Sequence, residues 1–594
     1  MGVFSVMKRA EVSEIGQGTN VDLGHIEICS DWHLSFETEK VTQLDFGEWI
    51  FLWYGEFNTL PNFERVANLL RSGDFSELWG LRGVLIAVSQ ADRKLYIFND
   101  CYGSFPIFLN DGVQIGEPLA SDTQRRFADH DVDWVSFYQF LSFGYIFSPY
   151  SLFKGVRRLG ANNGVQISFR GEKPEVRTFP LKNFWAPDVA SRTATIDEFI
   201  DILRDEAKSF ESTQLMMSGG WDSRLLLAAL GREKLNLYTH GNLASREIAI
   251  VRDIAAECHL PLIERNFSQS DFNVCQFELF LDKNESAMFT HWNNAGVVAN
   301  NHRSIMTAGT FGEVLGGHYG TLNTLPGKRK YLSLLMHMLG VGPMLDRALN
   351  LHDRHTVLGY LRASGYKVFW FIQDFLAEEL ESRNLVDKSN DRLDRLFQSY
   401  EEEGMESAQG MFERFYTEHR GGQYINRQLT NSARNHGYRN VFTNRDLVAA
   451  ASSLPFSQRA HNKINREIIK KLSPELLHFP LAATLADAGR PLLIQEASRA
   501  ARKLVESKPL CGSIYRKVSR YGNRSFGWND FRGVVDDGWV RTLSPLLTDE
   551  IWNIDKIAEA ARPEGASNMY PLFDMISKAI TLDYQLRTLQ FRHS

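Results

Sequence analysis

The chain has 594 residues, a length that favours two large domains or three to four smaller ones. The net charge is −6 and 43% of the residues are apolar, so the composition predicts sizeable cores and gives no indication of nucleic-acid binding. No apolar run is long enough to cross a bilayer, and no signal-peptide pattern opens the chain, so no transmembrane segment is expected. The five cysteines are scattered and form no CxxC pair, which fits a reducing cytoplasm.

Residues 1–182 are predicted to form a first, β-rich domain. Short runs of β-forming residues bounded by turn residues predict strands, and apolar residues at helical spacing predict two helices. The strands are expected at 49–54, 83–89, 94–99, 105–109 and 113–116, and the helices at 62–71 and 134–143. Strands with a few helices on their outer faces predict an α+β sandwich.

Residues 183–195 lack periodicity and are predicted to be a linker to a second domain, 196–594. That domain begins with a helix at 196–210 and continues as a β-α-β-α-β run. The strands are expected at 213–217, 235–239, 260–264 and 304–308, and helices at 224–230, 245–258, 331–409 and 572–589. This alternation predicts a doubly wound parallel sheet, which binds ligands at the carboxyl ends of its strands.

The first strand of the second domain runs directly into a glycine turn and then into a helix. Glycines let the backbone approach a ligand closely, and N–H groups at a helix N-terminus favour an anion. Asp222 stands where a carboxylate suits a divalent cation beside a phosphate, and Ser223 is placed to cap the helix. An ordinary strand-to-helix turn is the alternative. We favour nucleotide binding by Ser218, Gly219, Gly220, Asp222 and Ser223.

A second glycine cluster follows the strand expected at 304–308. Gly309, Gly312 and two further glycines surround a single acid, Glu313, and such a loop can wrap a pyrophosphate and present a carboxylate to magnesium. Asp222 and Glu313 are therefore the candidate metal ligands, and a glycine-rich turn with a solvent-facing Glu313 is the alternative. Glu247 opens a helix near the same edge, and its favoured interpretation is a favourable charge on the helix dipole.

Two known families share these motifs. Ser-Gly-Gly-x-Asp-Ser at 218–223 resembles the signature of the PP-loop ATP pyrophosphatases, and 309–317 is similar to the Ser-Gly-Glu-Gly-Ala-Asp-Glu-Leu-Phe-Gly-Gly run of the asparagine synthetases. Motifs at 55–58, 99–106 and 119–122 resemble, in that order, the glutaminase domain fused to those synthetases. The resemblance covers nearly the whole chain. It implies an Ntn-type α+β sandwich, a PP-loop α/β domain of the adenine nucleotide α-hydrolase-like type with many added helices, and ATP and Mg²⁺ as cofactors.

The resemblance also implies a catalytic pair in the segment 461–474. The family has a lysine and an arginine in a helix here, and its lysine is implicated in stabilising the charge on an adenylated intermediate. Lys463 and Arg466 match this pair, although their spacing is one residue shorter than the common Lys-x-x-x-Arg. Gly437 and Asn444 depart from the family, because acids are usual at both positions.

The N-terminus departs most from the family. Glutaminases of this class use a cysteine that becomes the N-terminal residue after removal of Met, whereas this chain has Gly2. We therefore expect a glutaminase-like fold without glutaminase activity. Nitrogen would then come from free ammonia, from an amine already present in the substrate, or from a partner.

The resemblance predicts an asparagine-synthetase-like, ATP-dependent amide ligase that adenylates a small-molecule, sugar-acid or peptide carboxylate for attack by ammonia or an amine. Alternatives are a cyclase of the lasso-peptide or β-lactam type, an amidotransferase for sugar acids of surface polysaccharides, and a non-catalytic nucleotide-binding scaffold. The oligomeric state stays open, a homodimer included. A basic stretch, 499–524, is either a solvated face or a dock for an anionic substrate or a membrane surface.

Overall fold

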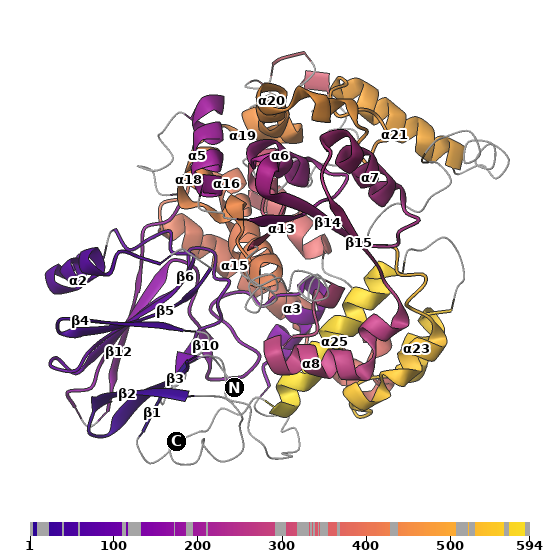
Figure 1. The fold of residues 1–594 in the computed structure, drawn as a ribbon. Helices are drawn as coiled ribbons and strands as arrows, with labels where there is room; N and C mark the ends of the chain where they lie inside the picture. Colours follow the sequence, from indigo (N-terminus) through magenta and orange to yellow (C-terminus); the bar gives the residue numbers. More distant parts are fainter. Residues whose placement is uncertain are drawn as a thin grey trace.

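The computed structural model describes residues 4–8, 23–38, 41–56, 60–75, 77–109, 115–116, 132–171, 173–185, 194–208, 212–284, 286–291, 305–317, 332, 335–336, 339–341, 344, 354–364, 369–427, 438–506, 521, 529–562 and 569–588. Gly2, Gly437, the motif at 119–122 and most of the basic stretch 499–524 lie outside these residues. Figure 1 shows an antiparallel β part at the lower left, a parallel sheet among helices, and a helical layer at the lower right.

The first part of the chain forms three antiparallel sheets. Their strand orders are β1-β3-β2, β10-β8-β9 and β12-β11-β7-β6-β5-β4. The strands are β1 Phe4–Lys8, β2 Leu23–Cys29, β3 Trp32–Glu37, β4 Thr42–Phe46, β5 Trp49–Gly55, β6 Gly83–Ser89, β7 Lys94–Phe98, β8 Phe108–Leu109, β9 Ile115–Gly116, β10 Arg157–Arg158, β11 Asn163–Ser168 and β12 Glu175–Pro180. One apolar core lies between the sheet β1-β3-β2 and the six-stranded sheet, and it contains Val6, Leu34 and Ile86. The predicted β-rich part is therefore present.

The two helices predicted in this part lie in different places. α2 (Phe63–Ser72) packs on the outer face of the six-stranded sheet, begins at the N-cap Asn62 and ends at Gly73. α3 (Trp134–Phe143) does not cover the sandwich, because its apolar residues belong to the core of the C-terminal helices (Figure 1). Eight of its ten residues are buried, among them the polar Ser136, Gln139 and Ser142, so the helix needs cover on nearly every side. The expectation that this helix lies on the sandwich is therefore wrong.

The predicted parallel sheet is present, with four strands in the order β15-β14-β13-β16. The strands are β13 Thr213–Met216, β14 Leu235–Gly241, β15 Leu262–Asn266 and β16 Ile305–Ala308, and every neighbouring pair is parallel. Met216 is level with Tyr238 on one side and with Ala308 on the other. Because β13 and β16 end at the same level, the two glycine loops that follow them start side by side.

Helices pack against this sheet and continue into the C-terminal layer. The α-helices are α5 Ile196–Lys208, α6 Trp221–Ala229, α7 Arg246–Cys258, α8 Val274–Asn284, α10 Glu313–Gly316, α13 Arg354–Ser364, α14 Asp374–Ser382, α15 Leu385–Glu402, α16 Ala408–Phe415, α18 Arg445–Ser453, α19 Phe456–Arg459, α20 Lys463–Leu472, α21 Leu492–Glu506, α23 Asp537–Thr542, α24 Ile554–Ala560 and α25 Tyr570–Thr588. A π-helix, η6 (Tyr416–Asn426), follows α16 directly. The short 3-10 turns are η2 Arg232–Lys234, η3 Gln269–Phe272, η5 Phe369–Phe371, η7 Val441–Thr443, η8 Ala460–Asn462, η9 Pro474–His478 and η10 Ser544–Leu546.

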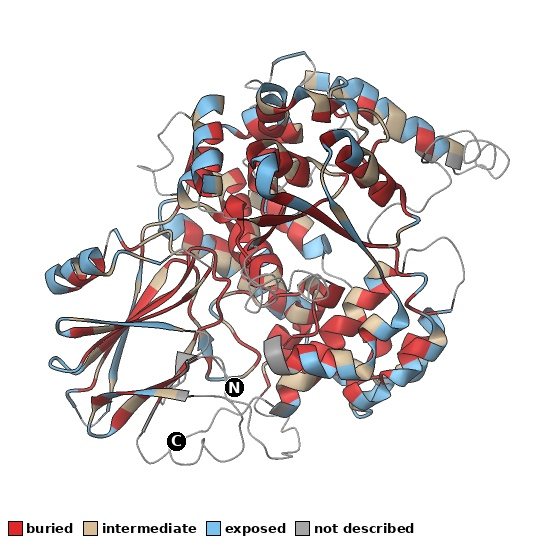
Figure 2. Cartoon of the chain, viewed as in Figure 1, coloured by how far each residue is buried: buried red, intermediate tan, exposed pale blue. Residues whose placement is uncertain are grey.

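Burial follows this arrangement. Figure 2 shows buried residues concentrated on the central sheet and on the helices around it, whereas the tips of the antiparallel strands are exposed. Among the described residues, no helix combines the length and the apolar character that a membrane crossing requires.

A buried ionic network joins the antiparallel part to the parallel-sheet part. Arg82, which precedes β6, donates to Glu206 of α5 at 2.6 Å and lies 3.4 Å from Glu56. Arg439 donates to the same Glu206 at 2.8 Å. Burial alone raises the pKa of Glu206, but Arg82 and Arg439 outweigh it and hold that pKa below its usual value. Glu206 is therefore ionised at neutral pH, as a carboxylate between two guanidinium groups should be.

Candidate functional site

The first glycine loop is folded by its own side chains. Ser218 N–H donates to Ser223 Oγ at 3.1 Å, Gly220 N–H donates to Ser218 Oγ at 3.2 Å, and the two hydroxyl oxygens are 2.9 Å apart. The helix begins at Trp221 with Gly220 as its N-cap, so the predicted capping role of Ser223 is wrong. Ser223 instead closes the loop that precedes its helix, donating to the Ser218 carbonyl. The N–H groups left for an anion are therefore those of the first turn of α6, which have no acceptor within the helix.

Glu247 holds the middle of the same loop. Its Oε1 accepts a hydrogen bond from Gly219 N–H at 3.1 Å, and its side chain is buried at the start of α7. The favoured interpretation, a charge that only complements the helix dipole, therefore missed this contact. A carboxylate in the first helical turn satisfies both the dipole and the loop.

The second glycine loop packs directly against the first. A Cβ atom at Gly309 would lie 2.6 Å from the backbone nitrogen of Ser223, and one at Gly312 would lie 2.5 Å from Asp222 Cγ. Real Cβ atoms essentially never come closer than 3.0 Å to another heavy atom. Glycine is therefore required at both positions by the close approach of the two loops, which brings together the residues predicted from two distant stretches of sequence.

Asp222 and Glu313 form a pair of neighbouring carboxyl groups at this contact. The pKa of Asp222 is raised well above its usual value, first by burial and second by the charge of Glu313. Glu313 Oε2 is buried and accepts no hydrogen bond within the described part of the chain. Two neighbouring carboxyl groups, one with a buried oxygen that accepts no hydrogen bond in the described structure, are the oxygen donors that a divalent cation prefers. The residues present thus fit a magnesium ion.

Asn465 of α20 completes the surroundings of Asp222. Its Nδ2 donates to Asp222 Oδ1 at 2.9 Å, and its own Oδ1 is buried without a hydrogen bond in the described structure. No pattern in the sequence singles out this asparagine, because it lies 243 positions after Asp222. Its place in the segment that also holds Lys463 and Arg466 was the one available signal.

Lys463 and Arg466 are not brought into contact with the carboxyl pair. Lys463 is exposed at the first position of α20, about 200° around the helix from Asn465. Arg466 donates to the Gly489 carbonyl at 2.7 Å and so braces the chain that follows the helix. Asn444, where the family has an acid, caps α18 and donates to Glu206 at 2.8 Å.

A buried arginine fastens a further segment over the first loop. Arg224 is fully buried and donates to three carbonyls, those of Leu476, Phe479 and Pro480, at 3.0, 2.9 and 3.0 Å. Burial lowers its pKa to about 10, which still leaves it charged at neutral pH. Just beyond these carbonyls, Ala482 N–H donates to the Gly219 carbonyl at 3.2 Å.

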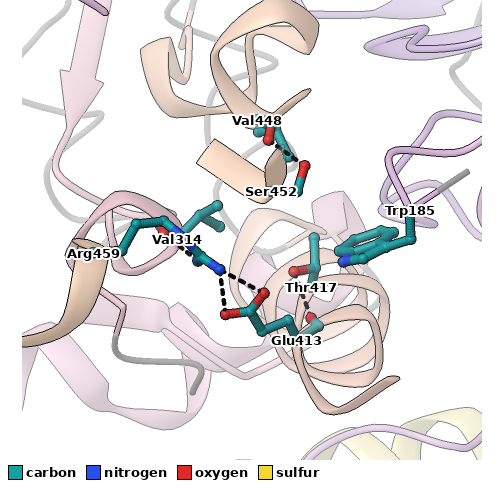
Figure 3. Close-up of a pocket in the computed structure, with 7 residues that line it drawn as sticks. All are labelled: Trp185, Val314, Glu413, Thr417, Val448, Ser452 and Arg459. Carbon is teal, nitrogen blue, oxygen red and sulfur yellow. Dashed lines mark hydrogen bonds and ion pairs between the residues drawn. The ribbon is translucent and has the colours of Figure 1, made fainter. Parts of the chain in front are cut away.

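A small cavity lies beside α10, the short helix that Glu313 begins. The cavity measures about 10 Å³ and is lined by Trp185, Val314, Glu413, Thr417, Val448, Ser452 and Arg459 (Figure 3). This is the space of one water molecule, too small for a substrate. Arg459 donates to both carboxylate oxygens of Glu413, at 2.8 and 2.9 Å, and to the Val314 carbonyl at 3.1 Å. The cavity therefore belongs to a brace that fixes α10.

Comparison with known proteins adds no family to these observations. The chain matches no protein-family model, and a search of curated proteins returns no match. The candidate site therefore rests on its residues, on their geometry and on the motif resemblance.

Proposed function

We propose that the chain is an ATP-dependent amide ligase of the asparagine-synthetase type. The observation that carries this proposal is the packing of Gly309 and Gly312 against Asp222, which brings a second acid, Glu313, to the nucleotide-binding turn. In this proposal the antiparallel part is an Ntn-type sandwich and the parallel-sheet part is a PP-loop domain.

The proposed reaction activates a carboxylate. An unactivated carboxylate does not react with an amine at a useful rate, because oxide is a poor leaving group. The substrate carboxylate attacks the α-phosphorus of ATP, pyrophosphate leaves, and an acyl-AMP forms. Ammonia or an amine then attacks the acyl carbon and releases AMP. The protein's contribution is positioning and electrostatic stabilisation.

Each residue of the candidate site has a role in this scheme. The first turn of α6 and the hydroxyl groups of Ser218 and Ser223 would hold phosphate oxygens, and Gly219 and Gly220 let the backbone approach them. Asp222 and Glu313 would hold Mg²⁺, which neutralises phosphate charge when bound. Lys463 and Arg466 are the residues that the family resemblance assigns to charge stabilisation during the reaction.

Gly2 determines the proposed nitrogen source. In the family that the motifs resemble, a cysteine at this position is the glutaminase nucleophile, so Gly2 favours free ammonia or an amine as the donor. An amine within the same substrate would make the enzyme a cyclase of the lasso-peptide or β-lactam type. A sugar acid would make it an amidotransferase of a polysaccharide pathway.

ATP–pyrophosphate exchange tests the proposal directly. Purified protein with Mg²⁺ is offered aspartate, sugar acids and peptides one at a time, and incorporation of labelled pyrophosphate into ATP is measured. We expect exchange with one acid class, and its loss in Asp222→Asn and in Glu313→Gln. Glu257→Gln, an exposed acid of α7, is the matched control and should exchange like the wild type.

Two outcomes would contradict the proposal. Exchange that persists in Asp222→Asn would place the chemistry elsewhere. Binding of MgATP without exchange for any acid in the panel would favour the non-catalytic nucleotide-binding scaffold.

A further inference from the structure

The loop that presents Glu313 has a backbone conformation that needs support from outside the loop. Phe311, at its centre, has a φ of 71°, in the left-handed region that bulky residues rarely adopt. Its side chain is fully buried. Such a conformation persists only where the surroundings over-determine it, and it is typical of functional sites. The contacts of Phe311 therefore show what holds the loop in place.

Phe311 is held between the antiparallel part and the π-helix η6. Its ring meets Tyr102 edge to face, with the centroids 4.8 Å apart and the planes at 64°. A Cβ atom at Gly421 of η6 would lie 2.8 Å from Phe311 Cζ, and one at Gly422 would lie 1.7 Å from the Tyr102 carbonyl oxygen. Only glycine fits at these two positions, so η6 touches both aromatic residues directly.

A series of hydrogen bonds also connects the antiparallel part to the second glycine loop, beside the aromatic contacts of Phe311 and Tyr102. Asn426, at the end of η6, donates to Ser104 Oγ at 2.8 Å. Asn440 donates to Asn426 Oδ1 at 3.2 Å and to Thr310 Oγ1 at 3.4 Å. Thr310 precedes Phe311 and shares a 2.8 Å hydrogen bond with the Tyr438 hydroxyl. Both sets of contacts begin in the loop 100–104 of the antiparallel part and end on the second glycine loop.

We propose that Tyr102 and Ser104 are positioning residues for the pair Asp222 and Glu313. The antiparallel part thereby acts on the parallel-sheet part as a structural effector. Displacing Phe311 moves Gly309 and Gly312, which touch Asp222, and changes where Glu313 begins α10. The proposal uses the proposed function only for the identity of the bound group, because the contacts themselves belong to the chain.

Hydrogen–deuterium exchange of the ligand-free protein tests the positioning itself. Gly312, Leu315 and Gly316 donate backbone hydrogen bonds within the loop and α10, so their exchange reports local opening. We expect about tenfold faster exchange of these amides in Tyr102→Ala. Tyr102→Phe, which keeps the ring, should exchange like the wild type.

Tyr96→Ala is the matched control. Tyr96 is also buried in the antiparallel part, but its neighbours are Trp49, Phe75 and Phe98 within that part. This variant should leave exchange of the loop unchanged. If Tyr102→Ala does not yield folded protein, Tyr102→Leu removes the ring edge while keeping apolar volume.

Calorimetric titration with ATP, with and without Mg²⁺, supplies the second readout. Loss of an outer contact that orients a metal ligand weakens metal binding by about 10- to 100-fold. We expect Tyr102→Ala to weaken MgATP binding by about that factor and to leave metal-free ATP binding within about threefold of the wild type. Tyr102→Phe should rescue MgATP binding.

The two readouts separate the positioning from the proposed function. Faster loop exchange in Tyr102→Ala, with a wild type that binds no ATP, would support the positioning and refute the nucleotide site. Unchanged loop exchange in folded Tyr102→Ala, or equally fast exchange in Tyr96→Ala, would overturn the positioning whether or not the protein binds ATP.

Discussion

Replacing Gly312 with alanine isolates the close approach of the two glycine loops. Gly312 has φ of −59° and ψ of −17°, which alanine adopts without strain, so the added methyl group is the only perturbation. That methyl group would lie 2.5 Å from Asp222 Cγ and 2.7 Å from its Oδ1, whereas ordinary contact begins at 3.4 Å. The loops must therefore separate by about 0.9 Å, the difference between 3.4 and 2.5 Å.

The size of this shift sets the expected effects of Gly312→Ala. Overpacking of a tight contact lowers the free energy of unfolding by about 1–3 kcal/mol, which urea denaturation measures. A displacement of about 1 Å in a reacting site costs about 100-fold in rate, so pyrophosphate exchange should fall by that factor.

Gly359→Ala is the matched control for this substitution. Gly359 lies within α13, and a Cβ atom there would meet nothing within 4 Å. This variant should raise the free energy of unfolding by about 0.5–1 kcal/mol, because alanine is the better helix former, and should leave exchange unchanged. A Gly312→Ala protein with wild-type stability and wild-type MgATP binding would refute the argument that the two loops are in contact.

Three further predictions concern buried charges, each measured by urea denaturation. Arg224→Met removes a donor from three carbonyls, of which that of Phe479 keeps Ala488 N–H, and should lower the free energy of unfolding by about 3 kcal/mol; no loss would contradict its anchoring role. Arg459→Met leaves Glu413 as an unpaired buried charge and should lower the free energy of unfolding by about 3–5 kcal/mol, whereas Arg541→Met, which removes a pair on the surface, should leave the free energy of unfolding nearly unchanged. Glu206→Gln should lower the free energy of unfolding at pH 7 by about 3–5 kcal/mol, because Arg82 and Arg439 lose the carboxylate that they share, although Arg82 keeps Glu56 at 3.4 Å. Folding lowers the pKa of Glu206, so the ionised carboxylate contributes its full stabilisation above pH 4.5. The difference in free energy of unfolding between the wild type and Glu206→Gln should therefore narrow as the pH falls below 4.5. A difference independent of pH would count against an ionised Glu206.

Local patterns predicted the parts of the fold that local physics determines. The β-α-β alternation gave the parallel sheet, since apolar strands and amphipathic helices have different periods. The two glycine loops were also found, because glycine clusters after strands indicate close approach of the backbone. The second loop contacts Asp222 of the first loop because β13 and β16 are adjacent parallel strands that end at the same level.

Contacts between distant stretches were not predictable in the same way. Asn465 contacts Asp222, and Arg82 contacts Glu206, only because the tertiary structure brings distant segments together. No local residue spacing indicates such partners. Ser223 was misjudged as a cap because a serine near a helix start has several backbone groups within reach. The location of α3 was missed for a similar reason, since a mostly apolar helix shows that it needs cover but not which helices provide it.

The location of α3 has a consequence for how the chain folds during synthesis. α3 ends at residue 143 and α25, which covers it, begins at residue 570, so 426 residues are made between them. At about 5–20 residues per second this takes roughly 20–90 s, during which an apolar helix lacks its final cover. We expect nascent chains to depend on a chaperone over this interval. A fragment ending near residue 182 would keep that exposed helix permanently and should aggregate.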